Sequence, residues 1–131
     1  MKKKIVGLGL GIVVAFAFTA CDPEKSFDAA LLIGKWERTS PYATAEKPGK
    51  ECYRYDRGGT GATWDTSEDV PEEDSQTFTW TLEKDLLTLL HDMEMDSTKK
   101  VPKYYTITAL DDKTLTYKDD FKNSFTFKKA Q

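Results

Sequence analysis

Apolar and polar side chains alternate along most of this chain, from residue 34 almost to its end. Between residues 76 and 83, for example, Phe78, Trp80 and Leu82 alternate with threonines and a glutamate. Alternation of this kind, with many aromatic and β-branched residues, is typical of β-strands that bury one face. The pattern predicts eight strands, near residues 35–40, 51–56, 61–66, 76–83, 86–95, 103–109, 114–118 and 123–129.

Short turn sequences separate these strands. Asp56-Arg57-Gly58-Gly59 is typical of a hairpin turn, and further turns are expected at residues 83–85, 111–113 and 119–123. Consecutive strands joined by short turns form an antiparallel up-and-down meander. Eight such strands can close into a barrel just wide enough for packed side chains or for one small ligand. The sequence therefore predicts an all-β fold, a small closed β-barrel.

Three segments interrupt or precede the alternation. Ser26 can cap a short helical turn over residues 27–32, which would come just before the first strand. The connections at residues 40–50 and 67–76 are longer than the turns. The second connection carries a run of acidic residues around Pro71, and we expect it to be a solvated loop.

The start of the chain predicts export and lipidation. Three lysines, an apolar run over residues 5–18 and Thr19-Ala20 are the parts of a secretory signal peptide. The run is shorter than the about 20 apolar residues that a membrane-spanning helix needs. Cys21 directly follows Ala20, as in a bacterial lipobox, where this cysteine is acylated and becomes the new N-terminus. We expect a lipoprotein signal peptide over residues 1–20, a lipidated tether over 21–30, a barrel domain over 31–131, and a membrane as partner.

Charge narrows the choice of other partners. Residues 1–20 hold three of the 19 basic residues and none of the 22 acidic ones, so the remaining chain has a formal charge of −6. An acidic chain repels phosphate backbones, and no basic stripe is present. We therefore expect no binding of nucleic acid.

No arrangement of residues in the sequence supports catalysis. The chain has one histidine, His91, and lacks the motifs that place a nucleophile beside a base. Cys52 has no partner for a disulfide if Cys21 is lipidated, and a lone cysteine is most often a small core residue. We expect a protein that is not an enzyme and that uses no metal and no cofactor.

Several short motifs resemble those of a known family. Leu32-Ile33-Gly34-Lys35-Trp36 is similar to the glycine-x-tryptophan opening of lipocalins, where a helical turn precedes the first strand. Further motifs follow in the same order: Gly58-Gly59-Thr60-Gly61, Tyr105-Thr106-Ile107-Thr108-Ala109-Leu110, Thr114-Leu115-Thr116-Tyr117 and Thr126-Phe127-Lys128-Lys129. Over most of residues 32–129 the chain resembles the lipocalin-like lipoproteins of Bacteroides-type bacteria.

The resemblance implies a fold and a location, although the chain differs from typical lipocalins in its length and in its last strand. It implies a small lipocalin-like barrel. The acidic residues just past Cys21 are similar to the export signal of such lipoproteins, which implies a lipid anchor in the outer membrane, at the cell surface. Typical lipocalins are longer, and their last strand carries an arginine that packs over the opening tryptophan. Here only Lys128 and Lys129 stand at that place.

The interior of the predicted barrel is rich in aromatic residues, and this has two interpretations. The inward positions are Trp36, Tyr53, Tyr55, Phe78, Trp80, Leu82, Leu87, Leu89, Tyr105, Ile107, Leu115, Tyr117, Phe125 and Phe127. Bulky rings can fill a small barrel completely. Alternatively, they can line a pocket in which tyrosine hydroxyls are the few polar groups.

These interpretations lead to two hypotheses for function. In the first, the barrel binds a small hydrophobic or amphipathic molecule, as lipocalins do. The ligand-binding residues would then be Trp36, Tyr55, Trp80, Leu89, His91, Tyr105 and Ile107, with His91 at the mouth of the cavity. In the second, a ligand-free barrel is a protein-binding or structural module of the cell envelope. Its contact surface would be the loops at residues 40–50 and 67–76.

Overall fold

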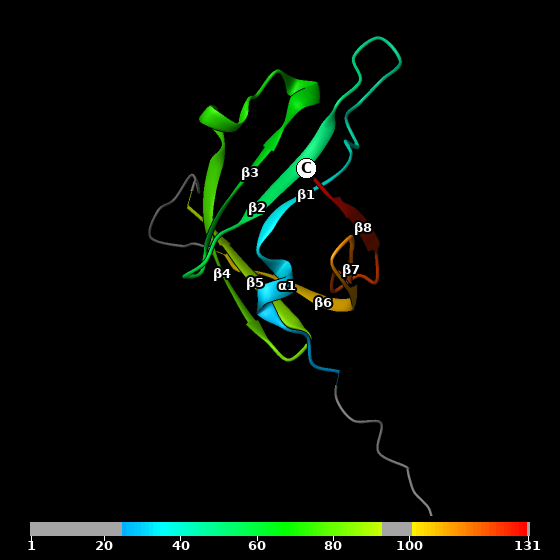
Figure 1. Cartoon of the computed structure of the whole chain (residues 1–131). Helices are drawn as coiled ribbons and strands as arrows, with labels where there is room; N and C mark the ends of the chain where they lie inside the picture. Colours follow the sequence, from blue (N-terminus) through cyan, green and yellow to red (C-terminus); the bar gives the residue numbers. More distant parts are fainter. Residues whose placement is uncertain (1–24, 93–100, 131) are drawn as a thin grey trace, which may run out of the picture.

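Eight antiparallel strands follow one another around a closed barrel in the computed structural model, which describes residues 25–92 and 101–130 (Figure 1). The strands are β1 (Gly34–Thr39), β2 (Lys50–Tyr55), β3 (Thr60–Asp65), β4 (Gln76–Glu83), β5 (Leu86–His91), β6 (Lys103–Leu110), β7 (Thr114–Lys118) and β8 (Ser124–Lys129). Each strand pairs with the next along the chain, and two residue pairs join β1 to β8. The predicted all-β fold, an eight-stranded antiparallel barrel, is confirmed.

The predicted strand limits agree with the structure to within one or two residues. The exception is the predicted strand over residues 86–95, because β5 is described only to His91 and residues 93–95 lie outside the described part of the chain. The predicted hairpin turns are also confirmed. Gly58 and Gly59 have φ angles of 88° and 87° between β2 and β3, a backbone conformation that glycine adopts without a steric penalty.

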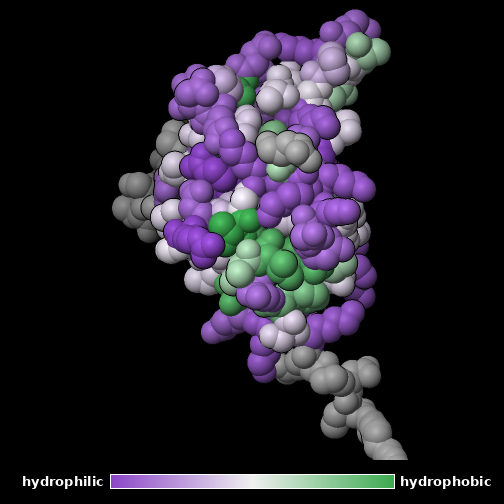
Figure 2. All heavy atoms as spheres, in the orientation of Figure 1, coloured by the Kyte–Doolittle hydropathy of each residue, from purple (hydrophilic) through white to green (hydrophobic). Residues whose placement is uncertain are grey.

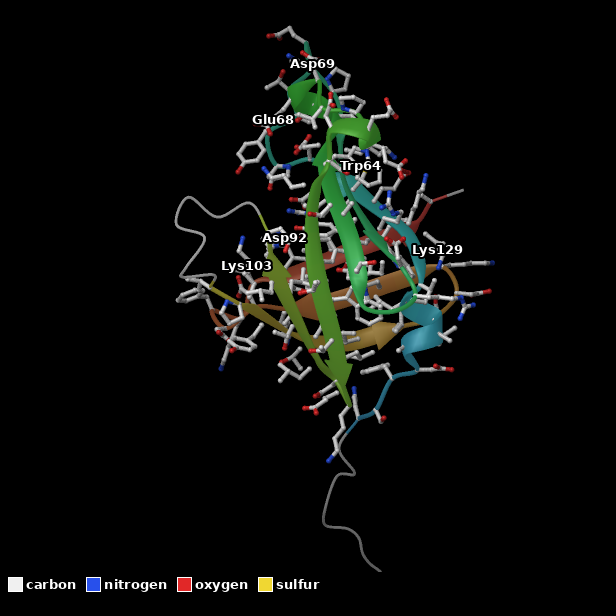
Figure 3. The ribbon with its side chains drawn as sticks, turned by 90° about the vertical axis from the view of Figure 1, so that its left-hand side faces the viewer. Trp64, Glu68, Asp69, Asp92, Lys103 and Lys129 are labelled. Carbon is white, nitrogen blue, oxygen red and sulfur yellow. The ribbon has the colours of Figure 1, made fainter. Side chains whose placement is uncertain are left out.

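The connections between strands fall alternately at the two ends of the barrel. We call one end the closed end: it carries the turns at residues 56–59, 84–85 and 111–113, and the helix α1 (Ala29–Leu32). The other, the open end, carries the longer connections at residues 40–49 and 66–75 and the turn at 119–123. In Figure 3, Lys129 lies beside α1, on the opposite side of the barrel from Asp92 and Lys103. No helix in the described residues is long and apolar enough to cross a membrane.

Helix α1 closes its end of the barrel, although its start differs from the prediction. Asp28, and not Ser26, is the N-cap: its carboxylate accepts a hydrogen bond from the Ala30 amide at 2.9 Å. Both residue types are good caps, and a helix of four residues has too little periodicity to choose between them. Leu32 is fully buried against the barrel, and the Phe27 amide donates to the Lys84 carbonyl in the β4–β5 turn.

The closed half of the barrel is filled with side chains. All fourteen residues predicted to face inward belong to the core or pack against it. Rings meet edge to face, as in the pair Tyr55 and Trp80, whose centroids are 5.7 Å apart. The absence of a side chain at Gly61 matters here, because a Cβ atom there would lie 2.6 Å from the Phe78 ring. In this half, the interpretation of a filled core is the one that fits.

Trp36 is fixed between α1 and the last strand. Its side chain is fully buried, and its indole Nε1 donates to the Leu32 carbonyl at 2.8 Å. The Lys129 ammonium lies 4.6 Å from the centre of the indole ring and donates to the Ile33 carbonyl at 2.6 Å. Gly34 leaves space for this lysine, whose Nζ would lie 2.7 Å from a Cβ atom at that position. Lys129 thus packs over Trp36 at the place where typical lipocalins have an arginine.

The acidic loop is solvated, as expected, since four of its five acidic residues are exposed, but it is not irregular. It forms two short turns, η3 (Thr66–Glu68) and η4 (Glu72–Asp74). Glu72 accepts hydrogen bonds from Lys35 at 2.8 Å and from Arg54 at 2.7 Å, which both lower the pKa of its carboxyl group. The loop therefore folds back over the outer face of β1 and β2, because outward-facing cations there attract it.

Cys52 is buried, as expected, but it lies on the outer face of β2 and not in the packed core of the barrel. Burial, with the nearby carboxylates of Glu37 and Asp65, raises the pKa of its thiol from 9.0 to about 11. The thiolate, which is the nucleophile, is therefore about 100-fold rarer at neutral pH than in an unperturbed cysteine.

We predict that iodoacetamide labels Cys52 at least about 100-fold more slowly in the native protein than in the unfolded protein at neutral pH. The native rate should rise with pH and reach half of its limiting value at about pH 11, where the thiol is half ionised. Mass spectrometry of residues 22–131 in buffer and in guanidinium chloride measures both rates. Equal rates would show that the thiol is neither buried nor perturbed.

Candidate functional site

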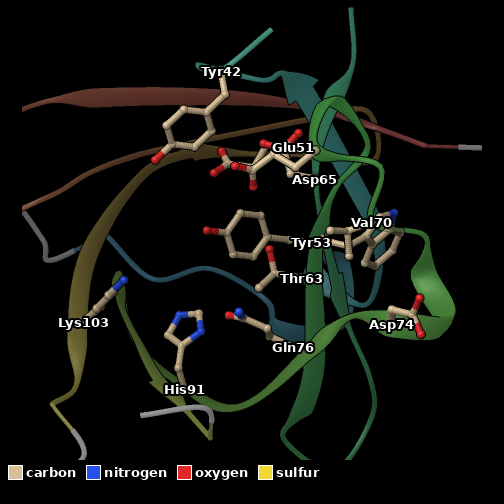
Figure 4. A pocket seen from close by; sticks show the side chains of 12 residues that line it. Tyr42, Glu51, Tyr53, Thr63, Asp65, Val70, Asp74, Gln76, His91 and Lys103 are labelled. Carbon is tan, nitrogen blue, oxygen red and sulfur yellow. The ribbon is translucent and has the colours of Figure 1, made fainter. Parts of the chain in front are cut away.

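A cavity of about 480 Å³ lies at the open end of the barrel (Figure 4). Its walls come from five strands and from the two long open-end loops. The lining residues are Tyr42, Glu51, Tyr53, Thr63, Trp64, Asp65, Glu68, Val70, Asp74, Gln76, His91 and Lys103. Most of these side chains carry a polar or charged group, so the cavity is a polar one with aromatic walls.

Strand alternation brings most of the lining together. Glu51 and Tyr53 face inward from β2, and they continue the series that buries Tyr55. Gln76, His91 and Lys103 likewise extend the inward faces of β4, β5 and β6 to the open end. Inward positions near the closed end are therefore apolar, whereas the same series becomes polar where it reaches the cavity.

Tyr53 forms the boundary between the filled core and the cavity. Its ring packs edge to face on Phe127, with centroids 5.5 Å apart, and its hydroxyl points into the cavity in Figure 4. Burial, helped by the charge of Glu51, raises the pKa of the Tyr53 phenol above its usual value. This phenol is uncharged at neutral pH and can donate a hydrogen bond to a ligand.

More tyrosine hydroxyls lie below this boundary. Burial also raises the pKa values of Tyr55, Tyr105 and Tyr117, and neighbouring phenols add to the shift at Tyr55 and Tyr117. The fully buried Tyr55 hydroxyl has no hydrogen-bond partner among the described residues. Tyr55 and Tyr117 belong to the filled core, so the expectation that tyrosine hydroxyls serve as polar groups of a ligand pocket stays a prediction.

An ion pair stands inside the mouth of the barrel. Arg38 Nε donates to the Glu51 carboxylate at 2.6 Å, and both side chains are largely buried. The guanidinium group also lies over the ring of Phe125, 5.1 Å from its centre. Such a pair is held by stacking as well as by charge, because a guanidinium is planar and weakly hydrated. Arg38 balances the charge of the Glu51 carboxylate, which can still accept a hydrogen bond at the cavity wall.

One side of the rim is fixed by hydrogen bonds between the two open-end loops. The buried Ser40 hydroxyl donates to Asp65, and the Ser67 hydroxyl and amide donate to the other oxygen of the same carboxylate. Burial acts to raise the pKa of Asp65, but these hydrogen bonds outweigh it and lower that pKa. The carboxylate is therefore charged at neutral pH and holds the two loops together at the cavity wall.

The structure divides the seven predicted ligand-binding residues between cavity and core. His91 lines the cavity, half-buried, with its ring 5.5 Å from that of Phe78. Tyr105 lies at a neighbouring groove of about 340 Å³ beside Phe121. The other five are packed in the filled core: Trp36, Tyr55, Trp80, Leu89 and Ile107. Whether a ligand reaches any of the seven stays a prediction.

Sequence reasoning did not identify several of the cavity residues. Glu51, Gln76 and Lys103 each lie two positions beyond an inward apolar residue, so the alternation contains the signal that could have found them. Tyr42 and Asp74 come from long loops, where no periodicity indicates a direction. Arg38 was missed although it alternates with Trp36, because a charged residue in a strand is usually taken as outward-facing.

A family model described as a lipocalin-like domain matches residues 32–117, which run from the end of α1 to β7 and include all the residues that line the cavity. No curated protein and no solved structure matches the chain.

Proposed function

The chain belongs to the lipocalin-like domain family, and from this premise we propose that it is a lipid-anchored binding protein for one small amphipathic molecule. The family is typically a non-enzymatic binding fold, which favours binding over catalysis. The observation that carries the proposal is the cavity at the open end of a barrel whose other end is filled. Pockets of this size, within the range of about 300–1,000 Å³, are typical of small-molecule sites.

The lining favours an amphipathic ligand over a purely hydrophobic one. The rings of Tyr42 and Tyr53 offer apolar surface, whereas Thr63, Gln76 and Lys103 offer hydrogen-bonding groups. A fatty-acid chain would leave these polar groups unpaired on burial, which costs about 1–3 kcal/mol for each group. A ligand with an apolar body and several polar substituents would satisfy both kinds of surface.

The proposed location follows from the start of the chain. The signal peptide over residues 1–20 and the acylated Cys21 would anchor the protein in the cell envelope, at the outer membrane. The lipid would supply the membrane attachment, and the barrel would carry the binding site.

Native mass spectrometry of residues 22–131, exported and purified without detergent, tests the binding proposal. We expect a reproducible extra mass that leaves on denaturation. Tyr53→Phe keeps the packed ring but removes the hydroxyl that points into the cavity, so occupancy should fall about five- to tenfold, the effect of one lost hydrogen bond.

The matched control is Thr81→Val, on the exposed outer face of β4, which should leave occupancy unchanged. A clean ligand-free mass, together with no binding of an amphipathic fluorescent probe such as anilinonaphthalene sulfonate, would contradict the proposal. Equal occupancy in Tyr53→Phe and the unchanged protein would place the ligand elsewhere.

A second candidate function is that of a protein-binding module of the envelope, with the open-end loops as its contact surface. The observation in its favour is a pair of exposed aromatic side chains at the open end, Tyr42 and Phe121, with 67% and 84% of their surface exposed. Aromatic residues are enriched in protein interfaces. A partner that is retained by the unchanged protein and lost on Phe121→Ser, with ligand occupancy unaltered, would favour this function.

A further inference from the structure

We propose that the closed end of the barrel faces the membrane and that the cavity opens away from it, toward the aqueous phase. The inference rests on the proposed lipid anchor at Cys21. The occupant of the closed-end surface is then the lipid bilayer that holds this anchor. Three observations on the described residues carry the inference: the place where the chain enters the barrel, the apolar surface around it, and the unequal charge of the two ends.

The entry of the chain lies at the closed end. The Phe27 amide bonds to the β4–β5 turn at Lys84, and α1 follows directly on this end. Six residue steps separate Cys21 from Phe27, and even a fully extended chain of this length spans only about 20 Å. The point at which the barrel is tied to the anchor therefore stays near the bilayer surface.

An inverted barrel would need a longer tether. Strands of six to eight residues are about 20–26 Å long, and their tilt in the barrel shortens this height only in part. The loops at residues 40–49 and 66–75 project beyond the strands at the open end and add to the distance (Figure 1). With its mouth on the bilayer, the protein would hold Phe27 farther from the surface than the six steps from Cys21 allow.

The surface around the entry point is apolar. Figure 2 shows hydrophobic side chains gathered over α1, whereas the loop end above it is mostly hydrophilic. Ala29, Ala30 and Leu31 of α1 are exposed, and Leu86 is exposed at the start of β5 at the same end. Such side chains gain free energy by lying against the interfacial region of a bilayer, because apolar area leaves water.

The charges at the two ends of the barrel favour the same orientation on the membrane. The open-end connections at residues 40–49, 66–75 and 119–123 carry eight acidic residues and two lysines. The closed-end turns at residues 56–59, 84–85 and 111–113 are nearly balanced, with four acidic and three basic residues. An anionic membrane surface therefore repels the open end far more than the closed end. Ligand would enter the cavity from the aqueous side or from a soluble partner, and not directly from the bilayer.

Labels at the two ends of β7 test this orientation in the full-length lipidated protein. Asp112→Cys lies in the closed-end turn and Asp120→Cys in the open-end turn, both exposed and each removing one negative charge. In a Cys52→Ser background the introduced thiol is the one that reacts, because Cys21 is acylated. Each variant is labelled with bimane and reconstituted into vesicles of phosphatidylcholine and phosphatidylglycerol that contain a lipid with a nitroxide headgroup.

We expect the nitroxide to quench bimane at position 112 at least about twofold more strongly than at position 120, since the two positions are separated by the length of a strand. Equal quenching, or stronger quenching at position 120, would overturn the proposed orientation. Vesicle binding by residues 22–131, which lack Cys21 and the signal peptide, as strong as that of the lipidated protein would overturn the anchor and with it the orientation. Ligand occupancy is measured separately on the soluble form, residues 22–131. A failure of the binding proposal is therefore distinguished from a failure of the anchor or of the orientation.

Discussion

Replacement of Trp36 by alanine is expected to lower the free energy of unfolding by about 3–5 kcal/mol, the range for a large aromatic side chain removed from a core. The indole is fully buried, so its removal leaves a cavity between α1, β1 and β8. The loss also leaves the Leu32 carbonyl without its donor and removes the ring beneath Lys129. Urea unfolding of residues 22–131, followed by fluorescence of the remaining tryptophans, measures this change.

Further substitutions separate the contributions of packing and polar contacts at Trp36. Trp36→Phe keeps an aromatic ring but cannot donate to Leu32, and it should destabilise by about 1–3 kcal/mol. Lys129→Met keeps most of the side-chain length and loses the charge above the ring. A double-mutant cycle of Trp36→Leu and Lys129→Met removes the ring and the charge in turn, and it should give a coupling energy of about 0.5–1 kcal/mol, the scale of one cation–π contact. If the two changes were additive, the lysine would be a neighbour of the ring without stabilising it.

Replacement of Trp80 by alanine is expected to lower the free energy of unfolding by a similar amount, about 3–5 kcal/mol, without lowering ligand occupancy in the folded protein. Trp80 lies in the filled half of the barrel, edge to face with Tyr55, and its Nε1 donates to the Thr60 carbonyl at 2.8 Å. It does not line the open-end cavity. Stability from denaturant unfolding and occupancy from native mass spectrometry are measured on the same preparation.

The outcome at Trp80 decides how deep the binding site is. A variant that stays stable while it loses its ligand would mean that the ligand penetrates the interior, among the tyrosines below Tyr53. Trp80→Phe serves as the control, since it retains a ring against Tyr55 and should destabilise less than the alanine variant.

The strands and turns could be predicted because their determinants are local. The period of two along residues such as Phe78, Trp80 and Leu82 depends only on near neighbours, and the Gly58-Gly59 turn carries its own signature. Closure of the barrel followed from the number of strands and the shortness of their connections. These features reproduce the observed fold with small errors at the strand ends.

The candidate site could be predicted only in part, because it depends on contacts between distant parts of the chain. Ser40, Asp65 and Ser67 meet only once the open-end loops have folded against each other. The lysine over Trp36 is another example: Lys129 and the Ile33 carbonyl to which it donates are 96 positions apart in the sequence. His91 was placed at the mouth because it continues an alternating strand, whereas the same alternation left open whether the residues below it fill the barrel or line a pocket.

The pairing of β1 with β8, which closes the barrel, determines how far a folded domain must extend along the chain. Two residue pairs connect these strands, compared with six between β1 and β2, and β8 lies wholly beyond residue 117, where the family match ends. A recombinant fragment cut at that residue would leave β1 and β7 with unpaired edges, whose free amide and carbonyl groups recruit strands from other molecules. Such a fragment would aggregate, so the smallest soluble version of this domain must extend through Lys129.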